Sequence, residues 1–486
     1  MRTHALLIST LAIAAMLANC SEAKNSKDDN GGTGGSGGAG AAGGAGAAGG
    51  AAGAGAAGGA GATGATGGAS GDGGPGGTGA TGGDGGTGAT GGSGSDGGPG
   101  GTGATGGSGG TGGALTCSTG ALLQGDPLYN DKPDAGNPKP AGQGLLADPP
   151  LRNEAIAVIG NKLFVETEFE VWSADLSAAT PMISRFAGVE GDAYINAGVA
   201  CRDTRFLVVR DMVATADGKL VLCDYVGGAI IEITDPGGPN CQSHWVAGTH
   251  ARTNDPGNDY PLAKGDRDGP GAQALFGGPA KDGAGIHKVT VDPSGNIYTW
   301  DEGTGKYKKI ATDAARTVST IGKSPADDNI MALAFLNGKL YATGVDGTND
   351  FLLEVDPAHY DAANPTANVK EVFRARDHFD DVRAGSQGIP GGLVSDGQAL
   401  IMSAQSGFVW RVAADGTVLA TLAGTGARLD FDPGFDPLVP HPASEWQLVS
   451  SVSNSNGGPW LAFTGGKLYW SGGIGIGKYI LRFNCP

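Results

Sequence analysis

A glycine-rich segment between residues 31 and 113 limits what this chain folds into more than any other feature. It holds nearly half of the 93 glycines and contains no aromatic residue and no Val, Ile, Leu or Met. Such a segment has no side chains to bury and does not repay the entropy lost on ordering. We therefore expect the folded part to be residues 115–486, which carry all seven tryptophans and are enough for one large all-β domain.

The first residues have the pattern of a secretory signal. A short basic start is followed by an apolar run, Ala5 to Leu17, that is too short to span a bilayer. The run ends in Leu17-Ala-Asn-Cys20, which resembles the lipobox of bacterial lipoproteins. The resemblance implies a signal peptide at 1–19, a lipid on Cys20, and anchoring in the bacterial cell envelope, at the outer membrane or cell surface. An ordinary secretory signal with a chance cysteine is the alternative.

Residues 20–114 are expected to be a disordered tether. Glycine stands at every third position from Gly31 to Gly112 except at Ala52 and Ser70. This period resembles bacterial collagen-like sequences, and the resemblance implies a trimeric stalk as one alternative. Only Pro75 and Pro99 interrupt the segment, far fewer prolines than collagen strands carry, so the pattern favours a flexible coil spanning roughly 50 Å.

Charge excludes some partners. The formal net charge is −17, and the sequence pI is near 4.7. Nucleic-acid affinity depends on Lys and Arg that neutralise phosphates, so no nucleic-acid partner is expected. The same charge disfavours electrostatic docking to anionic lipid. The expected partners are the membrane, through the lipid anchor, and an unknown protein or glycan.

The chain after residue 115 is repetitive. A glycine turn followed by a short strand recurs at 160–165, 218–222, 295–299, 338–342, 397–401 and 466–470. An apolar alternation precedes each copy, a third strand follows most copies, and a fourth is suggested at 243–248, 318–322 and 418–424. Four short antiparallel strands in each repeat predict the blade of a β-propeller. We expect a six-bladed propeller over 115–486, or a seventh partial blade drawn from residues 115–152.

One repeat resembles a known family. The run Gly265-Asp-Arg-Asp-Gly-Pro-Gly-Ala-Gln-Ala-Leu-Phe276, with Val291-Asp-Pro-Ser-Gly-Asn-Ile-Tyr298 after it, is similar to an NHL repeat. The resemblance implies a propeller and, most often, a recognition surface, but no particular reaction. Where that family usually has Val-Ala-Asp, this chain has Thr-Trp-Asp-Glu. Trp300, Asp301 and Glu302 are therefore candidate ligand-binding residues.

Cysteine positions fit a closed ring. Cys117 and Cys485 stand at the two ends of the folded part, and a propeller brings its termini together, so we expect a disulfide between them. Cys201 and Cys241 lie in loops of one blade region and form a second candidate pair. Cys223 lies in a predicted strand as a buried free thiol. Disulfides imply an oxidising compartment.

Candidate metal ligands are sparse. Alignment of the predicted inner strands places Glu154, Asp211 and His287 at equivalent positions near the mouth of the central channel. Carboxylates with an imidazole can bind a divalent metal. Propeller lactonases of the gluconolactonase type and amidating lyases use metal ligands at such places, but neither full ligand set is present here. The alternative is that these residues are solvated and hydrogen-bonded to loops.

The sequence favours binding over catalysis. No complete catalytic constellation is visible, so no catalytic residue and no obligatory cofactor is assigned. The leading hypothesis is a surface-anchored lipoprotein that presents an NHL-like propeller to a protein, peptide or glycan. The second is a metal-dependent propeller lactonase, hydrolase or lyase. The third is a stalked collagen-like adhesin.

Overall fold

The computed structural model describes residues 115–124, 155–167, 169–178, 181–189, 197–248, 264–278, 285–325, 329–345, 350–374, 390–404, 407–426, 439–446, 448, 460–474 and 477–486. The predicted signal peptide, Cys20, the tether and Glu154 lie outside these residues. Within the described ranges, no helix has the length and apolar character that crossing a bilayer requires.

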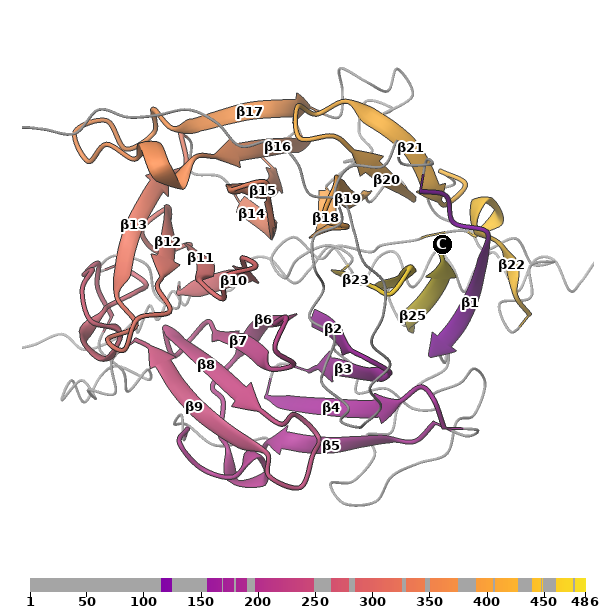
Figure 1. The fold of residues 1–486 in the computed structure, drawn as a ribbon, viewed down its shortest axis with the longest axis horizontal. Helices are drawn as coiled ribbons and strands as arrows, with labels where there is room; N and C mark the ends of the chain where they lie inside the picture. Colours follow the sequence, from indigo (N-terminus) through magenta and orange to yellow (C-terminus); the bar gives the residue numbers. More distant parts are fainter. Residues whose placement is uncertain are drawn as a thin grey trace, which may run out of the picture. The chain divides into compact units, whose positions relative to one another are not determined.

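The described strands form six antiparallel sheets, which are the blades in Figure 1. Blade 1 consists of β2 (Ala155–Ile159), β3 (Lys162–Glu166), β4 (Glu170–Asp175) and β5 (Ile183–Gly188). Blade 2 consists of β6 (Val209–Ala214), β7 (Leu220–Asp224), β8 (Ala229–Thr234) and β9 (Gln242–Ala247). Blade 3 consists of β10 (Ile286–Val291), β11 (Ile297–Asp301), β12 (Lys306–Ile310) and β13 (Val318–Lys323). Blades 4 and 5 consist of β14 (Asn329–Leu336), β15 (Lys339–Val345), β16 (Asp350–Val355) and β17 (Val369–Arg374); and β18 (Pro390–Ser395), β19 (Leu400–Ala404), β20 (Phe408–Val412) and β21 (Val418–Ala423). The sixth sheet has the order β22 (His441–Pro442), β1 (Thr119–Gln124), β25 (Gly477–Asn484), β24 (Lys467–Ile474) and β23 (Trp460–Thr464).

The blades close into a ring. The innermost strand of each blade contacts that of the next, in the order β2, β6, β10, β14, β18 and β23, and β23 returns to β2. Figure 1 shows the six blades around a common centre. The prediction of a six-bladed β-propeller is therefore confirmed.

Glycine turns start the second strand of each blade. The hairpins after β6 and β10 place Gly218 and Gly295 at φ values of 81° and 82°. An L-residue rarely adopts this left-handed conformation, whereas glycine adopts it without a steric penalty. Glycine therefore recurs in the turn signature because it lets the chain reverse direction between the first and second strands of a blade.

The hydrophobic core lies between neighbouring blades. Each of six buried clusters draws side chains from two adjoining blades, as where Phe164 of blade 1 packs with Met212 and Leu222 of blade 2. The cluster around Tyr469, Ile480 and Ile156 joins the last blade to the first. Apolar burial of this kind is the main stabilising term in folding, and here it depends on a closed ring.

The N-terminal strand completes the last blade. Strand β1 pairs antiparallel with β25, where Gly120 faces Phe483 and Leu122 faces Leu481. A side chain at Gly120 would meet the Trp446 ring at 2.3 Å, so only glycine fits this contact. Residues 119–124 therefore form the fourth strand of blade 6. The alternative of a seventh partial blade is wrong for this strand, and residues 125–152 lie outside the described part.

Both expected disulfides are present. One joins Cys117 to Cys485 across 368 positions of sequence, and the other joins Cys201 to Cys241 across 40. Cys223 is a buried free cysteine, as predicted. The first bond ties the chain before β1 to the end of β25, so it locks the two ends of the propeller together.

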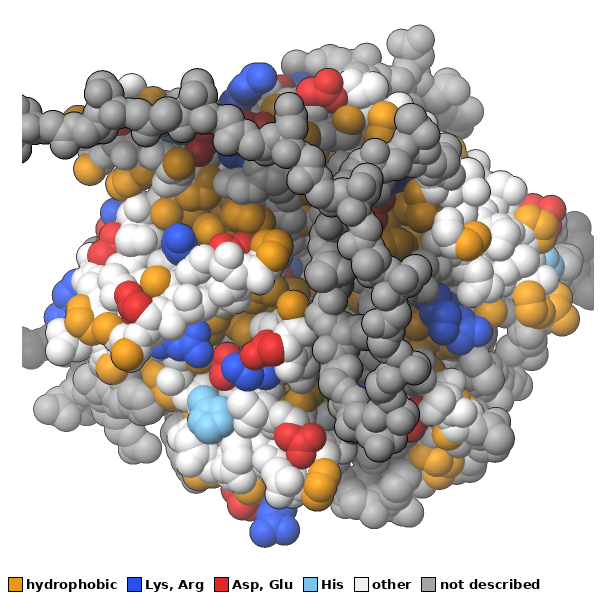
Figure 2. All heavy atoms as spheres, in the orientation of Figure 1, with side chains coloured by type: hydrophobic (Ala, Val, Ile, Leu, Met, Phe, Trp, Pro, Cys, Tyr) orange, Lys and Arg blue, Asp and Glu red, His pale blue; other side chains and the backbone are white. Residues whose placement is uncertain are grey.

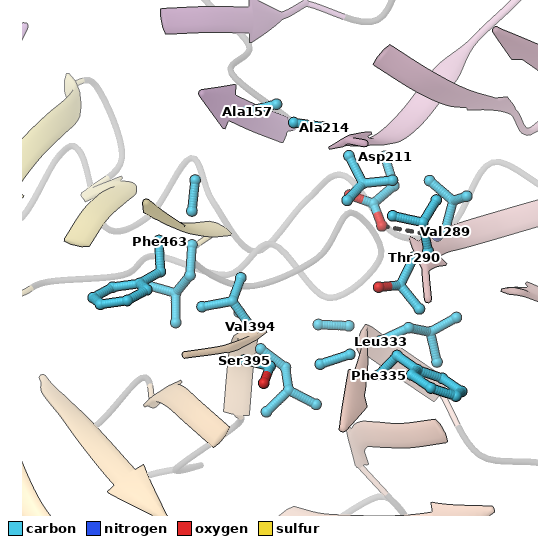
Figure 3. A pocket seen from close by; sticks show the side chains of 18 of the residues that line it. Ala157, Asp211, Ala214, Val289, Thr290, Leu333, Phe335, Val394, Ser395 and Phe463 are labelled. Atoms are coloured by element: carbon cyan, nitrogen blue, oxygen red, sulfur yellow. Dashed lines mark hydrogen bonds between the residues drawn. The ribbon is translucent and has the colours of Figure 1, made fainter. Parts of the chain in front are cut away.

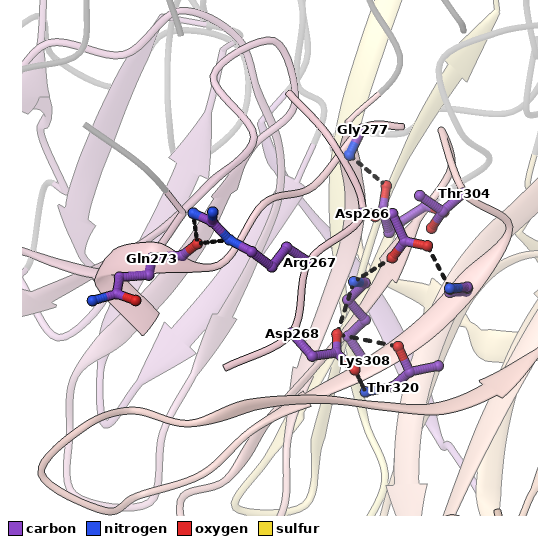
Figure 4. Close-up of polar contacts among 10 residues, drawn as sticks. Asp266, Arg267, Asp268, Gln273, Gly277, Thr304, Lys308 and Thr320 are labelled. Carbon is purple, nitrogen blue, oxygen red and sulfur yellow. Dashed lines mark hydrogen bonds and ion pairs between the residues drawn. The ribbon is translucent and has the colours of Figure 1, made fainter. Parts of the chain in front are cut away.

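The segment 264–278, which carries the distinctive blade 3 motif, is held against β12 and β13 by ion pairs (Figure 4). The Lys308 side chain has no exposed surface, and its Nζ lies 2.9 Å from Asp266 Oδ1 and 3.0 Å from Asp268 Oδ1. Asp268 also accepts hydrogen bonds from the backbone N–H and hydroxyl of Thr320. Two carboxylates thus compensate one buried ammonium group.

The ring closure predicts an asymmetry between the two disulfides. Replacing Cys117 and Cys485 by Ser should lower the free energy of unfolding by about 2–5 kcal/mol, because the bond closes a very long loop. The matched control is Cys201→Ser/Cys241→Ser. The bond that it removes closes a shorter loop, so the free energy of unfolding should fall by less. Denaturant unfolding of the full chain measures both losses. An equal or larger loss in the control would contradict this account of closure.

Candidate functional site

The centre of the propeller holds a cavity of about 390 Å³. Inner strands of all six blades contribute to its wall, and Figure 3 shows their side chains surrounding an open space. Figure 2 shows hydrophobic side chains gathered toward the middle of the ring. A cavity of this size is in the range of small-molecule sites.

Most of the cavity wall is hydrocarbon. One level of the inner strands, at the residues that precede the hairpin turns, carries Val158, Ala214, Val291, Phe335, Ser395 and Phe463. Beyond this level the cavity reaches the exposed turn residues Ala216, Pro293 and Gly397. The apolar half of the channel therefore lies on the side of the hairpin turns, where solvent has access.

The opposite end of the cavity is charged. Asp211 of β6 and Trp460 of β23 line it, and Lys288 of β10 lies between them. The Lys288 Nζ is 5.6 Å from the centre of the Trp460 ring. Blade 6 stands opposite blade 3 in the ring, so the contact between Lys288 and Trp460 spans the channel near this end; Lys288 is 1% exposed and is not itself a residue of the cavity wall.

Asp211 is fixed by backbone donors. Its Oδ1 accepts a hydrogen bond from its neighbour, the Met212 N–H, and its Oδ2 accepts one from the Val289 N–H of the next blade, at 2.9 and 3.0 Å. Burial raises the pKa of the Asp211 carboxyl, while the Lys288 charge and these hydrogen bonds act in the opposite direction. The carboxylate therefore links two blades.

His287 points into a different environment. It occupies a β-bulge between Ile286 and Lys288, is 3% exposed, and lies 5.4 Å from the Tyr225 ring. The Arg210 guanidinium lies over the same tyrosine at 5.5 Å. Burial, together with the charges of Lys288 and Arg210, holds the pKa of His287 well below its ordinary value. The imidazole is therefore neutral near pH 7.

Strand register corrects the predicted equivalence of Asp211 and His287, while Glu154 lies outside the described residues. Asp211 pairs with Cys223 and Lys288 pairs with Trp300, each the fourth residue of the second strand of its blade. Asp211 therefore corresponds to Lys288, because the hairpins that follow β6 and β10 are equally long and each inner strand contains a bulge. Sequence alignment shifted this register by one residue.

The metal hypothesis stays a prediction. Glu154 lies outside the described residues, and among those described no three His, Cys, Asp or Glu side chains gather as a metal site would need. Asp211 already accepts two backbone hydrogen bonds and stands beside the ammonium group of Lys288. A cation at that place favours an anion over a metal ion.

The other predicted ligand-binding residues lie within or against blade 3. Trp300 is 1% exposed and packs on Tyr307, with ring centres 4.8 Å apart. Asp301 has no exposed surface, accepts a hydrogen bond from the Gly277 N–H, and has its pKa raised to about 6 by burial. Glu302 is half-buried, and its N–H donates to the Gly285 carbonyl. Their role in ligand binding remains untested.

Two residues of the charged end escaped the sequence analysis, Lys288 and Trp460. The run Ile286-His-Lys-Val-Thr-Val291 places two basic residues inside an otherwise apolar strand, which is an available signal for a buried cation. Trp460 had no such signal, because its importance depends on facing β10 across the ring.

The buried imidazole predicts a pH dependence. Unfolded histidine takes up a proton as the pH falls below about 6.5, whereas folded His287 resists protonation. The unfolded state then binds more protons, so stability falls, by up to about 2 kcal/mol at pH 5. Denaturant unfolding at pH 7.5 and pH 5 should show this loss in the natural chain and less of it in His287→Gln. The exposed-histidine control His244→Gln should behave like the natural chain; a loss that persists in His287→Gln would contradict the prediction.

Comparison with known proteins gives no family. No family model matches the chain, and no curated protein matches it. Solved structures that it resembles include virginiamycin B lyase from Staphylococcus aureus, at 9% identity and a TM-score of 0.37, with 69% of this chain and 96% of the lyase covered. A gluconolactonase from Xanthomonas campestris shares 12% identity at a TM-score of 0.40, and the match covers 77% of this chain and 98% of the gluconolactonase. A structure of the nidogen/laminin complex shares 14% identity at a TM-score of 0.35, and the match covers 64% of this chain and 91% of the other.

These similar structures include both enzymes and a binding complex. At such identities and TM-scores they carry no argument about what this chain binds or catalyses. The assignment as a propeller depends on the strand pairing described above.

Proposed function

We propose that this protein is a lipid-anchored envelope protein whose propeller binds a ligand without transforming it. The observation that carries the proposal is the central channel, which is open on the side of the hairpin turns and has an apolar wall and a fixed charged end. Concave, largely apolar sites with a few oriented polar groups are typical of ligand recognition.

The polar groups near the channel favour binding over chemistry. Burial raises the pKa of the Cys223 thiol well above its ordinary value, which disfavours the nucleophilic thiolate. Each oxygen of Asp211 accepts a backbone hydrogen bond, one of them from the next blade, so the carboxylate has a structural role between two blades. Among the described residues, no hydrogen bond joins a nucleophile to His287, and its Nδ1 has no hydrogen-bond partner.

Anchoring supports the recognition role. The lipobox-like residues ending in Cys20 predict a membrane anchor, and residues 20–114 predict a long flexible connection to the propeller. A binding domain on such a tether samples a large volume near a membrane. A protein, peptide or glycan remains the expected class of partner for the outer surface. The collagen-like stalk and the metal-dependent enzyme remain alternatives.

The anchor is tested by substitution. Radiolabelled palmitate fed to bacteria that express the full chain should be incorporated, and the protein should fractionate with the envelope. Cys20→Ala should abolish both the incorporation of the label and the retention at the membrane, because residue 20 then has no thiol to which the diacylglycerol can be attached. Cys117→Ser serves as the control and should keep both. Label that persists in Cys20→Ala would contradict the proposed anchor.

Metal content separates binding from the metal-dependent alternative. Elemental analysis of the purified full chain should show no stoichiometric divalent metal, and its thermal melt should be unchanged by EDTA, because Lys288 stands beside Asp211. Asp211→Asn and His287→Gln should leave the metal content at the same background. A stoichiometric metal that either variant removes would support the enzyme instead.

A further inference from the structure

Lys288 is a buried ammonium group without an acceptor. It is 1% exposed, and its Nζ has no hydrogen-bond partner among the described residues. An ammonium group has three donors, and leaving them unsatisfied in a low-dielectric interior is costly. A buried polar group in this state calls for an explanation, and an acceptor supplied from outside the chain is one.

The same blade shows how this chain satisfies a structural lysine. Lys308 is equally buried, but the carboxylates of Asp266 and Asp268 reach its Nζ. Lys288 lies near the face of Trp460 and the charge of Asp211, and its Nζ donates no hydrogen bond among the described residues. Since the fold supplies two acceptors to one buried lysine and none to the other, Lys288 is not explained as a structural ion pair.

A second donor near Lys288 also lacks a partner. The indole Nε1 of Trp460 is buried and has no acceptor among the described residues. Each oxygen of Asp211 accepts one hydrogen bond, from the N–H groups of Met212 and Val289, and among the described residues no hydrogen bond joins this carboxylate to Lys288 Nζ. The charged end of the cavity therefore has an excess of donors and calls for an acceptor, preferably an anionic one.

The remainder of the cavity calls for hydrocarbon. From Asp211 and Trp460 to the turns, most of the lining side chains are aliphatic or aromatic, with Val291, Phe335 and Phe463 near the mouth. The polar side chains in the same stretch of wall are Thr290, Asp292 and Ser395. The three apolar side chains near the mouth are only partly buried, so a chain that covered them would remove apolar surface from water. A sugar ring or a charged peptide would leave its polar groups unpaired against this wall.

We propose that the channel binds a hydrocarbon chain that ends in a carboxylate. The carboxylate lies at Lys288 and accepts hydrogen bonds from its Nζ, and the chain extends toward the hairpin turns. This inference rests on the proposed function, since it names the ligand class of the same site. It assigns a binding role to Lys288, which the sequence analysis did not include.

The test uses the full chain with Cys20→Ala, which carries no lipid and needs no detergent. Isothermal titration compares dodecanoate, dodecanol and dodecyltrimethylammonium, which share a chain and differ in head group. Dodecanoate should bind with one site per chain and about ten- to hundredfold more tightly than dodecanol, the range expected for a charged hydrogen bond. Equal or tighter binding of dodecyltrimethylammonium would overturn the proposal.

Variants locate the site. Lys288→Met should weaken dodecanoate binding to the level of dodecanol, whereas Lys309→Met should not, because that lysine of the same blade lies over Tyr298. Ala214→Trp should fill the channel and abolish binding of both ligands. Dodecanoate binding that is unchanged in Lys288→Met would overturn the proposal. If that variant fails to fold by circular dichroism, the head-group preference of the natural channel decides alone.

The fate of the ligand separates this inference from the proposed function. Dodecanoate recovered unchanged by mass spectrometry, with binding lost in Ala214→Trp, supports both. Dodecanoate that is bound and converted would leave the channel site standing and overturn recognition without catalysis. Absence of binding by any of the three probes would overturn the channel proposal and leave recognition through the outer surface.

Discussion

Closure of the ring between the first and last blades is the constraint on which the rest of this structure depends. The inner strands meet side by side only if β23 returns to β2, and the core clusters lie between blades rather than within them. Strand β1 completes blade 6 from the other end of the domain, and the Cys117–Cys485 bond secures it. The channel exists only because this closure holds six inner strands around one axis.

How far the sequence predicted this fold depends on how local each signal is. Hairpins with a glycine turn and apolar alternation are local, so each of the six predicted turn-and-strand segments overlaps the second strand of a blade. Closure by a terminal strand is not local. Thr119–Gln124 carries no pattern that names its partner, and β25 lies more than 350 positions later. The disulfide was predictable because a closed ring brings the two chain ends together, whatever strand lies beside them.

The candidate site was predicted only in part. Asp211 stands seven residues before Gly218, and Lys288 stands seven before Gly295. The correspondence of Asp211 with Lys288 is therefore present in the spacing to the turn glycine, and the predicted pairing of Asp211 with His287 missed it by one residue. Trp460 enters the site only by standing across the ring from β10, a relation that no spacing in the sequence expresses. The sequence thus placed Asp211 near the central channel but did not predict Lys288 or Trp460.

The position of Cys117 also has a mechanical consequence. It precedes β1, so a pull on the chain before residue 115 reaches the disulfide before it reaches the hydrogen bonds between β1 and β25. The force then passes through the disulfide to Cys485, near the C-terminal end of the domain sequence, and β1 is not pulled away from its sheet. A propeller joined in this way resists unzipping under tension from its N-terminal side for as long as its surroundings remain oxidising.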